Sequence, residues 1–285
     1  MVRRLLSIMR PDQWTKNLVL FAGLIFAGDL GDADLAMLAV KGFLVFCLLS
    51  GASYILNDLL DIQSDRMHPE KSARPLASGE LSVTLAVGAG IVAAVGALVW
   101  AYTIHPEFGH TAAAYLLLNV VYTLVLKRMV ILDVMSIAVG FVLRAVASVE
   151  VLTGASPGIE LSPWLLVCTF FLALFLGLGA AAADHRATLA HYTPPLMDAL
   201  IGVVTAATVV SYAIYTIWPG TVEKVGSSQL VYTVPFVVYG VFRYLYLMVA
   251  KGSGGRPSRV LVTDVPLGVN ILLWVGIVIV VIYGS

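Results

Sequence analysis

Charged residues are scarce in this 285-residue chain: they make up 12% of it, whereas hydrophobic residues make up 60%. A soluble domain typically has about 25% charged residues, so most of this chain's surface must face lipid. Basic and acidic residues are equal in number, at 17 each, and the net charge of zero gives no indication of a nucleic-acid partner. The two cysteines, Cys47 and Cys168, lie inside apolar runs, and no disulfide framework is implied.

We also expect no secretory signal, because the N-terminal stretch MVRRLLSIMRPDQW has no long apolar run and no small-residue cleavage site. Arg3, Arg4 and Arg10 stand there beside aliphatic side chains. This combination predicts a short helix that lies in the membrane interface.

Long apolar runs, by contrast, fill most of the chain. A helix needs about 20 apolar residues to cross the bilayer core, and backbone groups in hydrocarbon must be hydrogen-bonded internally. The runs therefore predict an all-α membrane protein with nine transmembrane helices around a central cavity. No linker or shift in composition divides the chain, so we expect a single domain over residues 1–285. The predicted spans are approximately 14–28, 35–57, 82–104, 111–127, 131–151, 163–183, 197–217, 230–250 and 261–283.

The distribution of basic residues predicts the orientation of these spans. The segments on one side contain nearly all of the lysines and arginines, and the segments on the other side contain only Lys224; Lys41 lies just inside the second span. The basic side should be cytoplasmic, which puts the N-terminus in the cytoplasm and the C-terminus outside. Its basic residues are Arg3, Arg4, Arg10, Lys16, Arg66, Lys71, Arg74, Lys127, Arg128, Arg186, Lys251, Arg256 and Arg259.

An acidic segment follows the second predicted span. Asp58, Asp61 and Asp65 are spaced i, i+3 and i+7, so on a helix the three carboxylates share one face, with Asn57 beside them. Carboxylates crowded in this way repel one another unless a cation bridges them. Their hard oxygen atoms favour Mg²⁺ or Ca²⁺, and Mg²⁺ typically takes one or two carboxylates together with substrate phosphates.

Three cations follow the acidic segment directly: Arg66, Lys71 and Arg74. Positive side chains next to a carboxylate–metal cluster suit the binding of a diphosphate. The alternative interpretation is a solvated loop with ordinary surface charges.

The acidic segment, NDLLDIQSD, resembles the N-D-x-x-D-x-x-x-D signature of the UbiA-type prenyltransferases, which follows their second span. The resemblance extends over nearly the whole chain and implies a UbiA-like fold, with Mg²⁺ bound to the donor's diphosphate. Further stretches are similar to one branch, the decaprenyl-phosphate phosphoribosyltransferases. These stretches are RPDQWTKN, DRMHPEKSARPLASG, YTLVLKRMVILDV, FVLRAVAS and VPFVVYGVFRYLYL.

The resemblance to this branch implies transfer of 5-phosphoribosyl from phosphoribosyl diphosphate to a polyprenyl phosphate. Asp58, Asp61 and Asp65 would then be the catalytic metal ligands. The stretch from His68 to Lys71 distinguishes this branch most clearly, since a donor with an additional 5-phosphate needs additional cations.

Five further residues are candidates for substrate binding, each with an alternative. Lys16 at the first span either binds phosphate or extends to the membrane interface. Lys127 either binds phosphate or only determines topology, and Tyr122, about one turn earlier, either faces the cavity or is an interfacial aromatic residue. Arg144 is expensive inside an apolar span and either lines the cavity or forms a buried ion pair. Asp264, at the start of the last span, either lines the site or accepts a hydrogen bond from a neighbour.

The chain departs from the branch after the sixth span. There the branch has a motif like G-K-R-x-x-E and a later H-R pair. Gly179 matches the glycine, and His185 with Arg186 resembles the H-R pair, but the lysine, arginine and glutamate are absent. Either this half of the site has been lost, or the natural chain has a longer loop here. Arg186 is retained as a candidate for substrate binding.

Two other functions stay open from the sequence. One is a UbiA-type prenyltransferase with an isoprenoid diphosphate donor and an aromatic or lipid acceptor. The other is a non-catalytic protein that binds or transports lipid, which the absent motif favours. In each case we expect membrane lipids as surroundings and no nucleic acid as partner, and a homo-oligomer is left open.

Overall fold

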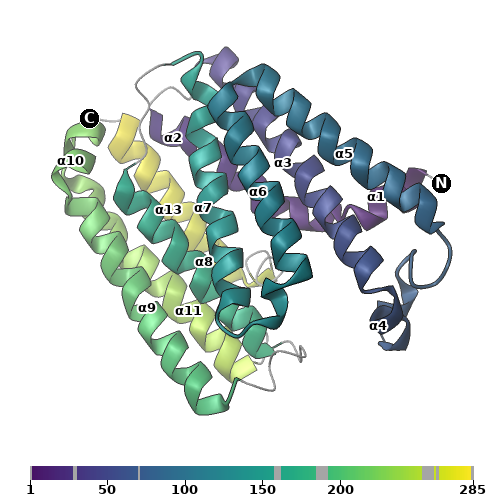
Figure 1. Cartoon of the computed structure of the whole chain (residues 1–285). Helices are drawn as coiled ribbons and strands as arrows, with labels where there is room; N and C mark the ends of the chain where they lie inside the picture. The colour runs from purple at the N-terminus through teal and green to yellow at the C-terminus, as the bar shows by residue number, and fades with distance from the viewer. Residues whose placement is uncertain are drawn as a thin grey trace. The chain divides into compact units, whose positions relative to one another are not determined.

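The computed structural model describes residues 2–27, 31–69, 71–156, 162–183, 192–251, 260 and 263–283. Within these residues every regular element is a helix (Figure 1). The predicted all-α fold is therefore confirmed. The first element, α1 (Val2–Ile8), is a short helix at the position where the arginines predicted one.

Seven helical segments of the described chain are long and apolar enough to cross a membrane, which makes the protein an integral membrane protein. The predicted number of nine is not confirmed. Of the first predicted span, 14–28, the described residues 14–27 belong to a 3-10 helix, η1 (Pro11–Phe21), and a short helix, α2 (Ala22–Ala27). The 19-residue helix α6 (Pro106–Leu124) is not one of the seven, and it has Glu107 in its first turn. The seven segments are Ala33–Leu60, Val83–Ile104, Leu132–Thr153, Pro163–Ala182, Pro194–Ile217, Gln229–Ala250 and Val265–Tyr283.

The chain divides into two compact units, which are described one at a time; the single domain over residues 1–285 stays a prediction. Unit 1 comprises Met1–Leu24, Asp29–Val125 and Leu143–Ile159. Its longest helix, α3 (Ala33–Leu60), begins at Asp32, whose side chain accepts hydrogen bonds from the first turn's N–H groups. Helix α3 packs along α5 (Val83–Ile104), and Ser82 caps α5 in the same way.

The core of unit 1 is built on α3. The ring of Phe46 lies 4.9 Å from that of Tyr115 and 6.0 Å from that of Phe108, both on α6. Gly23 makes a close backbone approach to Ser148 on α7 (Leu132–Thr153): its N–H donates to Ser148 Oγ at 3.1 Å. A Cβ atom on Gly23 would lie 2.0 Å from the Ser148 carbonyl oxygen, so no larger residue fits.

Unit 2 comprises Ile25–Gly28, Leu126–Val142 and Glu160–Ser285. Helix α8 (Pro163–Ala183) packs against α9 (Pro194–Ile217), and α11 (Val234–Lys251) packs against α9 and α13 (Val265–Tyr283). The rings of Phe175 on α8 and Tyr244 on α11 are 5.4 Å apart in the core of this unit. Prolines open several of its helices, where the missing N–H costs no hydrogen bond. Its elements are η3 (Leu126–Arg128), the first half of α7, α8 (Pro163–Ala183), α9 (Pro194–Ile217), α10 (Pro219–Val225), η5 (Gln229–Thr233), α11 (Val234–Lys251) and α13 (Val265–Tyr283).

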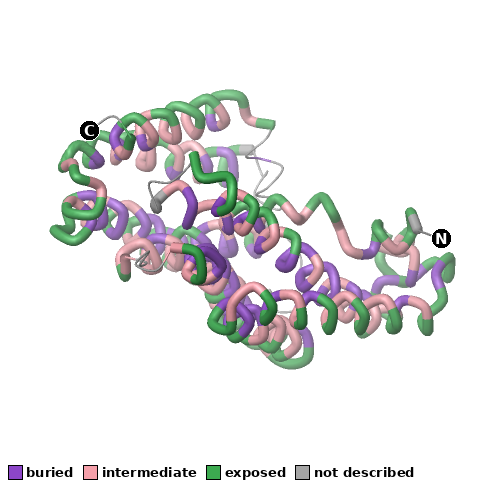
Figure 2. Tube along the Cα trace, turned by 90° about the horizontal axis from the view of Figure 1, so that it is seen from above, coloured by how far each residue is buried: buried purple, intermediate pink, exposed green. Residues whose placement is uncertain are grey.

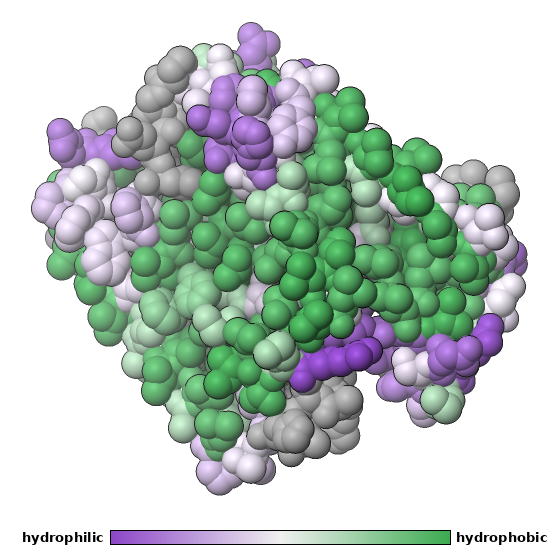
Figure 3. All heavy atoms as spheres, in the orientation of Figure 1, coloured by the Kyte–Doolittle hydropathy of each residue, from purple (hydrophilic) through white to green (hydrophobic). Residues whose placement is uncertain are grey.

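Buried and exposed positions alternate along the helices (Figure 2). In the most apolar 18-residue stretch of α5 only 11% of the residues are buried. Apolar side chains such as Val92, which is 73% exposed, therefore form its outer surface. Hydrophobic residues cover most of the face seen in Figure 3. This distribution suits helices whose outer faces contact lipid.

Candidate active site

The acidic segment lies in unit 1, where α3 ends and α4 (Ile62–Met67) begins. Asp61 stands at the joint, with φ −97° and ψ 6°. Helical hydrogen bonding continues through the joint: the Asp61 N–H donates to the Asn57 carbonyl at 3.0 Å, and the Asp65 N–H donates to the Asp61 carbonyl at 2.8 Å. Backbone hydrogen bonds between residues four apart thus continue through Asp61, although two helices meet there.

Two arginines neutralise the buried carboxylates of this segment. Asp58 and Asp65 are each only 4% exposed. Arg74 Nη1 lies 2.7 Å from Asp65 Oδ2 and 3.2 Å from Asp58 Oδ1, so one guanidinium joins both carboxylates. Arg10 Nη2 donates a short hydrogen bond to the same oxygen of Asp58. The repulsion expected between the carboxylates is thus offset by cations of the chain itself.

A Mg²⁺ ion needs oxygen ligands that converge on one point. Within the described residues, no three histidine, cysteine, aspartate or glutamate side chains are arranged to hold one. Asp58, Asp61 and Asp65 do not form such a group, and their joint role as ligands stays a prediction. Asp58 and Asp65 do converge on one nitrogen, Arg74 Nη1, and offer hard oxygen atoms there. This pair fits Mg²⁺, which takes one or two carboxylates and completes its shell with phosphate oxygens and water.

Arg66 of α4 and Lys71, which follows α4, contact different neighbours. Arg66 Nε donates to the Ala77 carbonyl at 3.1 Å, which fixes the following loop. Lys71 opens the short 3-10 helix η2 (Lys71–Ala73), and its N–H lies 3.4 Å from His68 Nδ1. The Lys71 side chain is half-buried and makes no ion pair with a described residue. Its ammonium is therefore available to an anionic ligand.

A second polar cluster lies inside unit 1, around Arg144 of α7. Arg144 is 6% exposed and donates to Asn17 Oδ1 at 2.8 Å and to the Tyr115 hydroxyl at 2.6 Å. The Asn17 amide in turn lies 3.3 Å from Ser50 Oγ and 3.4 Å from Cys47 Sγ. These contacts satisfy the guanidinium with neutral oxygens, and the role of Arg144 in substrate binding stays a prediction.

The remaining candidates of unit 1 are Lys16 on η1, Asn57 on α3 and Tyr122 on α6, all of them half-buried. Their roles in substrate binding stay predictions. In unit 2, Lys127 lies half-buried on η3. Arg186 lies outside the described residues.

Asp264 of unit 2 accepts hydrogen bonds from an arginine side chain and from a backbone N–H. Its oxygens receive Arg243 Nε at 3.1 Å and Arg243 Nη2 at 2.9 Å, and Oδ1 also receives the Leu267 N–H at 3.0 Å. Asp264 therefore caps the start of α13 and holds a guanidinium from α11. This agrees with the alternative in which it bonds a neighbour, and its contact with a substrate stays a prediction.

Asp133, another acidic residue at the edge of an apolar run, has a structural partner in unit 2. It accepts a hydrogen bond from the Tyr192 hydroxyl at 2.8 Å, and that hydroxyl accepts one from the Ile131 N–H at 2.7 Å. Ile131 has a φ of 74°, which is rare for a β-branched residue. Burial, together with the bond to Asp133, raises the pKa of Tyr192 to about 12. The phenol therefore stays protonated and holds this turn.

Sequence reasoning missed Arg10, Tyr54 and Asn17. Arg10 was interpreted as an interfacial and topological residue, whereas its guanidinium contacts Asp58 and lies 4.9 Å from the centre of the Tyr54 ring. Its φ of 51° turns the chain before Pro11. Tyr54 precedes Asp58 by one helical turn, so the helical spacing was the available signal for it. The signal for Arg10 was its place in the stretch RPDQWTKN, next to Lys16.

The sequence matches the UbiA prenyltransferase family over residues 17–263. The chain belongs to this family, and it is therefore a transferase of the UbiA type. Its helical architecture and its acidic segment after the second apolar run agree with that assignment.

Several curated relatives are called decaprenyl-phosphate phosphoribosyltransferase. The one from Corynebacterium glutamicum is 30% identical, over 98% of this chain and 86% of the relative. The one from Mycolicibacterium smegmatis is 29% identical over 306 aligned positions, which cover 100% of this chain and 94% of the relative. That alignment is longer than this chain, so the relative has residues without a counterpart here.

The fold has a solved counterpart in a UbiA homolog from Archaeoglobus fulgidus, whose structure was determined with GPP and Mg²⁺ bound. The TM-score is 0.74 and the identity 22%, over 98% of this chain and 99% of the homolog. At that identity the likeness concerns the fold alone. It confirms that the chain is UbiA-like in architecture.

Proposed function

We propose that the protein transfers the 5-phosphoribosyl group of phosphoribosyl diphosphate to a polyprenyl phosphate and releases diphosphate. The observation that carries this proposal is the buried pair Asp58 and Asp65, which Arg74 joins and which Lys71 follows; Lys71 makes no ion pair with a described residue. The name shared by the relatives that match over nearly the full chain supports the same activity.

The carboxylates of Asp58 and Asp65, with Asp61 between them in the sequence, would hold Mg²⁺, which supplies positive charge to the leaving diphosphate when it is bound. Lys71 and Arg74 neutralise further phosphate oxygens of the donor. Lys16 and Lys127 are proposed to do the same from their 3-10 helices. The other proposed substrate-binding residues are Asn57, Arg66, Tyr122, Arg144, Arg186 and Asp264.

In the proposed reaction, an oxygen of the lipid phosphate forms a bond to the anomeric carbon of the ribose. The bond between this carbon and the diphosphate oxygen breaks, and diphosphate leaves with the electron pair. Because the acceptor phosphate is already anionic, no general base is needed. The chain's residues then contribute mainly positioning and electrostatic stabilisation. The proposed orientation puts this chemistry on the cytoplasmic side of the cell membrane, since the basic residues gather there.

The test uses purified protein with Mg²⁺, polyprenyl phosphate and labelled phosphoribosyl diphosphate, and it measures label in the lipid phase. Lys71→Ala should weaken donor binding about tenfold or more, because a hydrogen bond to a charged group contributes about 1.5–3 kcal/mol. Arg3→Ala, which removes an exposed cation from α1, is the matched control and should leave donor binding unchanged. Absence of labelled lipid with the wild type would refute the proposal.

A second candidate is transfer from an isoprenoid diphosphate to an aromatic or lipid acceptor. The observation that favours it is the GPP bound in the Archaeoglobus homolog of the same fold. The two candidates differ in their donor. Tight binding of geranyl diphosphate, with no binding of phosphoribosyl diphosphate, would decide for the second.

A further inference from the structure

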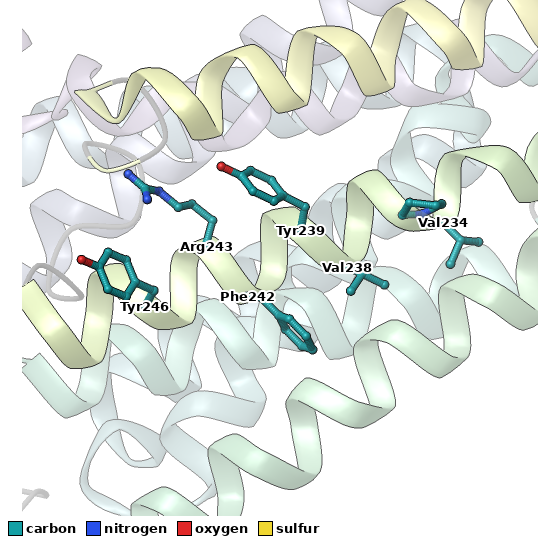
Figure 4. Close-up of a pocket in the computed structure, with 7 residues that line it drawn as sticks. Val234, Val238, Tyr239, Phe242, Arg243 and Tyr246 are labelled. Atoms are coloured by element: carbon teal, nitrogen blue, oxygen red, sulfur yellow. The ribbon is translucent and has the colours of Figure 1, made fainter.

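A groove of about 740 Å³ runs along α11 in unit 2. Seven side chains of that helix line it, and the only charged one among them is Arg243. Figure 4 shows Tyr239 and Arg243 extending to one side of α11, and Val238 and Phe242 to the other. The lining residues are Val234, Pro235, Val238, Tyr239, Phe242, Arg243 and Tyr246. The volume is in the range of ordinary small-ligand sites, about 300–1,000 Å³.

One end of the groove is apolar and the other is positively charged, which suits an amphiphilic ligand. From Val234 to Tyr246 the groove extends about 18 Å along the helix, at 1.5 Å per residue. The end near Val234 is apolar, whereas Arg243 lies toward the other end, with its guanidinium 5.4 Å from the centre of the Tyr246 ring. A ligand that fits this pattern has a long hydrocarbon chain and one anionic head.

Arg243 is already oriented for such a head. Asp264 engages its Nε and Nη2, which fixes the plane of the guanidinium. Its Nη1 makes no hydrogen bond to a described residue. A guanidinium has five N–H donors, so one edge can hold a carboxylate while the other binds phosphate.

Tyr239 gives a second, independent indication of a polar ligand. It is 45% exposed, lies one helical turn before Arg243, and its hydroxyl makes no hydrogen bond to a described residue. Tyrosines that face lipid usually lie at the ends of a span. Tyr239 instead lies near the middle of the apolar segment Gln229–Ala250, where an unsatisfied hydroxyl is costly.

We infer that this groove binds an isoprenoid lipid phosphate, with the phosphate at Arg243 and Tyr239 and the chain along the apolar lining residues toward Val234. The inference rests on the proposed function and identifies the groove as the docking site of its lipid acceptor. An isoprenoid chain with a terminal phosphate has the single anionic head and the unbroken apolar body that the groove accommodates. An ordinary phospholipid is the competing occupant.

The experiment measures equilibrium binding of farnesyl phosphate to the full chain in detergent. Val238→Trp fills the groove and should weaken binding about tenfold or more, and Tyr239→Phe, which removes only the hydroxyl, should weaken it about threefold. The matched control is Val203→Trp on α9, a 68% exposed position outside the groove, which should leave binding within about twofold of wild type. Binding of phosphoribosyl diphosphate is measured on each variant and should be unchanged, which also shows that the variants are folded.

The outcomes separate this inference from the proposed function. If farnesyl phosphate binds equally to wild type and Val238→Trp while phosphoribosyl transfer proceeds, the groove is not the acceptor site and the proposed function stands. If phosphatidylglycerol displaces farnesyl phosphate at equal concentration, the groove takes ordinary lipid and the inference is overturned. If the wild type neither binds farnesyl phosphate nor transfers phosphoribosyl to lipid, both fail.

Discussion

Replacing Asp58 by asparagine should destabilise the protein even without metal or substrate. The sequence alone predicts little cost to the metal-free protein, because removing one of three clustered carboxylates relieves repulsion. In the structure Asp58 instead receives hydrogen bonds from both Arg10 and Arg74. The substitution therefore removes the charge that holds two guanidinium groups, and through Arg10 it loosens the N-terminal segment from α3.

The magnitude follows from the burial of the partners. The Asp58 side chain is 5% exposed, whereas those of Arg10 and Arg74 are 26% and 29% exposed. Breaking a fully buried pair costs about 3–5 kcal/mol, and a single hydrogen bond to a charged group contributes about 1.5–3 kcal/mol. Water reaches both guanidinium groups, and asparagine keeps one acceptor oxygen. We therefore expect a loss of about 2–3 kcal/mol, or a melting temperature lower by roughly 4–10 °C.

The assay is thermal unfolding of purified protein in detergent, in a chelating buffer without substrate. Asp34→Asn is the matched control, because Asp34 is an exposed residue in the first turn of the same helix. It should cost less than about 1 kcal/mol. Equal melting temperatures for Asp58→Asn and Asp34→Asn would refute the reasoning, since Asp58 would then contribute no more than a surface carboxylate.

Two further predictions concern packing and orientation. Gly23→Ala should lower the free energy of unfolding by about 1–3 kcal/mol, because the new Cβ meets the Ser148 carbonyl. Gly88→Ala on α5 has no neighbour within 4 Å and should be neutral or stabilising by up to about 1 kcal/mol. Thermal unfolding of both variants measures this difference, and equal stabilities would contradict the close approach. A cysteine at His68 should resist an impermeant thiol reagent applied from outside the cell, and a cysteine at Lys224 should react; the reverse labelling would overturn the proposed orientation.

The helical fold could be predicted because its signals are local. Long apolar runs without charge can satisfy their backbone only as helices, and the runs ended close to where α3, α5, α8 and α9 end. The first predicted span differs because Pro11 opens a 3-10 helix there, and the bounds of η1 cannot be derived from hydropathy. The interruption of the acidic segment at Asp61 was also unpredictable, since its i, i+3, i+7 spacing is compatible with an unbroken helix.

The contacts between the candidate residues could not be predicted from the sequence. An ionisable side chain inside an apolar run is costly, so Arg144 could be recognised as needing a partner, and the crowded carboxylates of Asp58, Asp61 and Asp65 as needing a cation. The identity of each partner depends on tertiary packing. Arg10 lies 48 residues from Asp58, and no spacing rule connects them.

An ion pair with a carboxylate leaves part of a guanidinium open to a second anion. From sequence, a structural ion pair and a phosphate-binding residue look like exclusive roles. In Arg243, however, the carboxylate of Asp264 occupies Nε and Nη2 only, and in Arg74 both carboxylates contact the single nitrogen Nη1. Each guanidinium keeps N–H groups that point away from its carboxylate, and the pair has already fixed its orientation. A phosphate that binds there meets an ordered donor, so less side-chain entropy is lost on binding. In the proposed function the ion pair thus orients an arginine for phosphate, and the two roles belong to the same side chain.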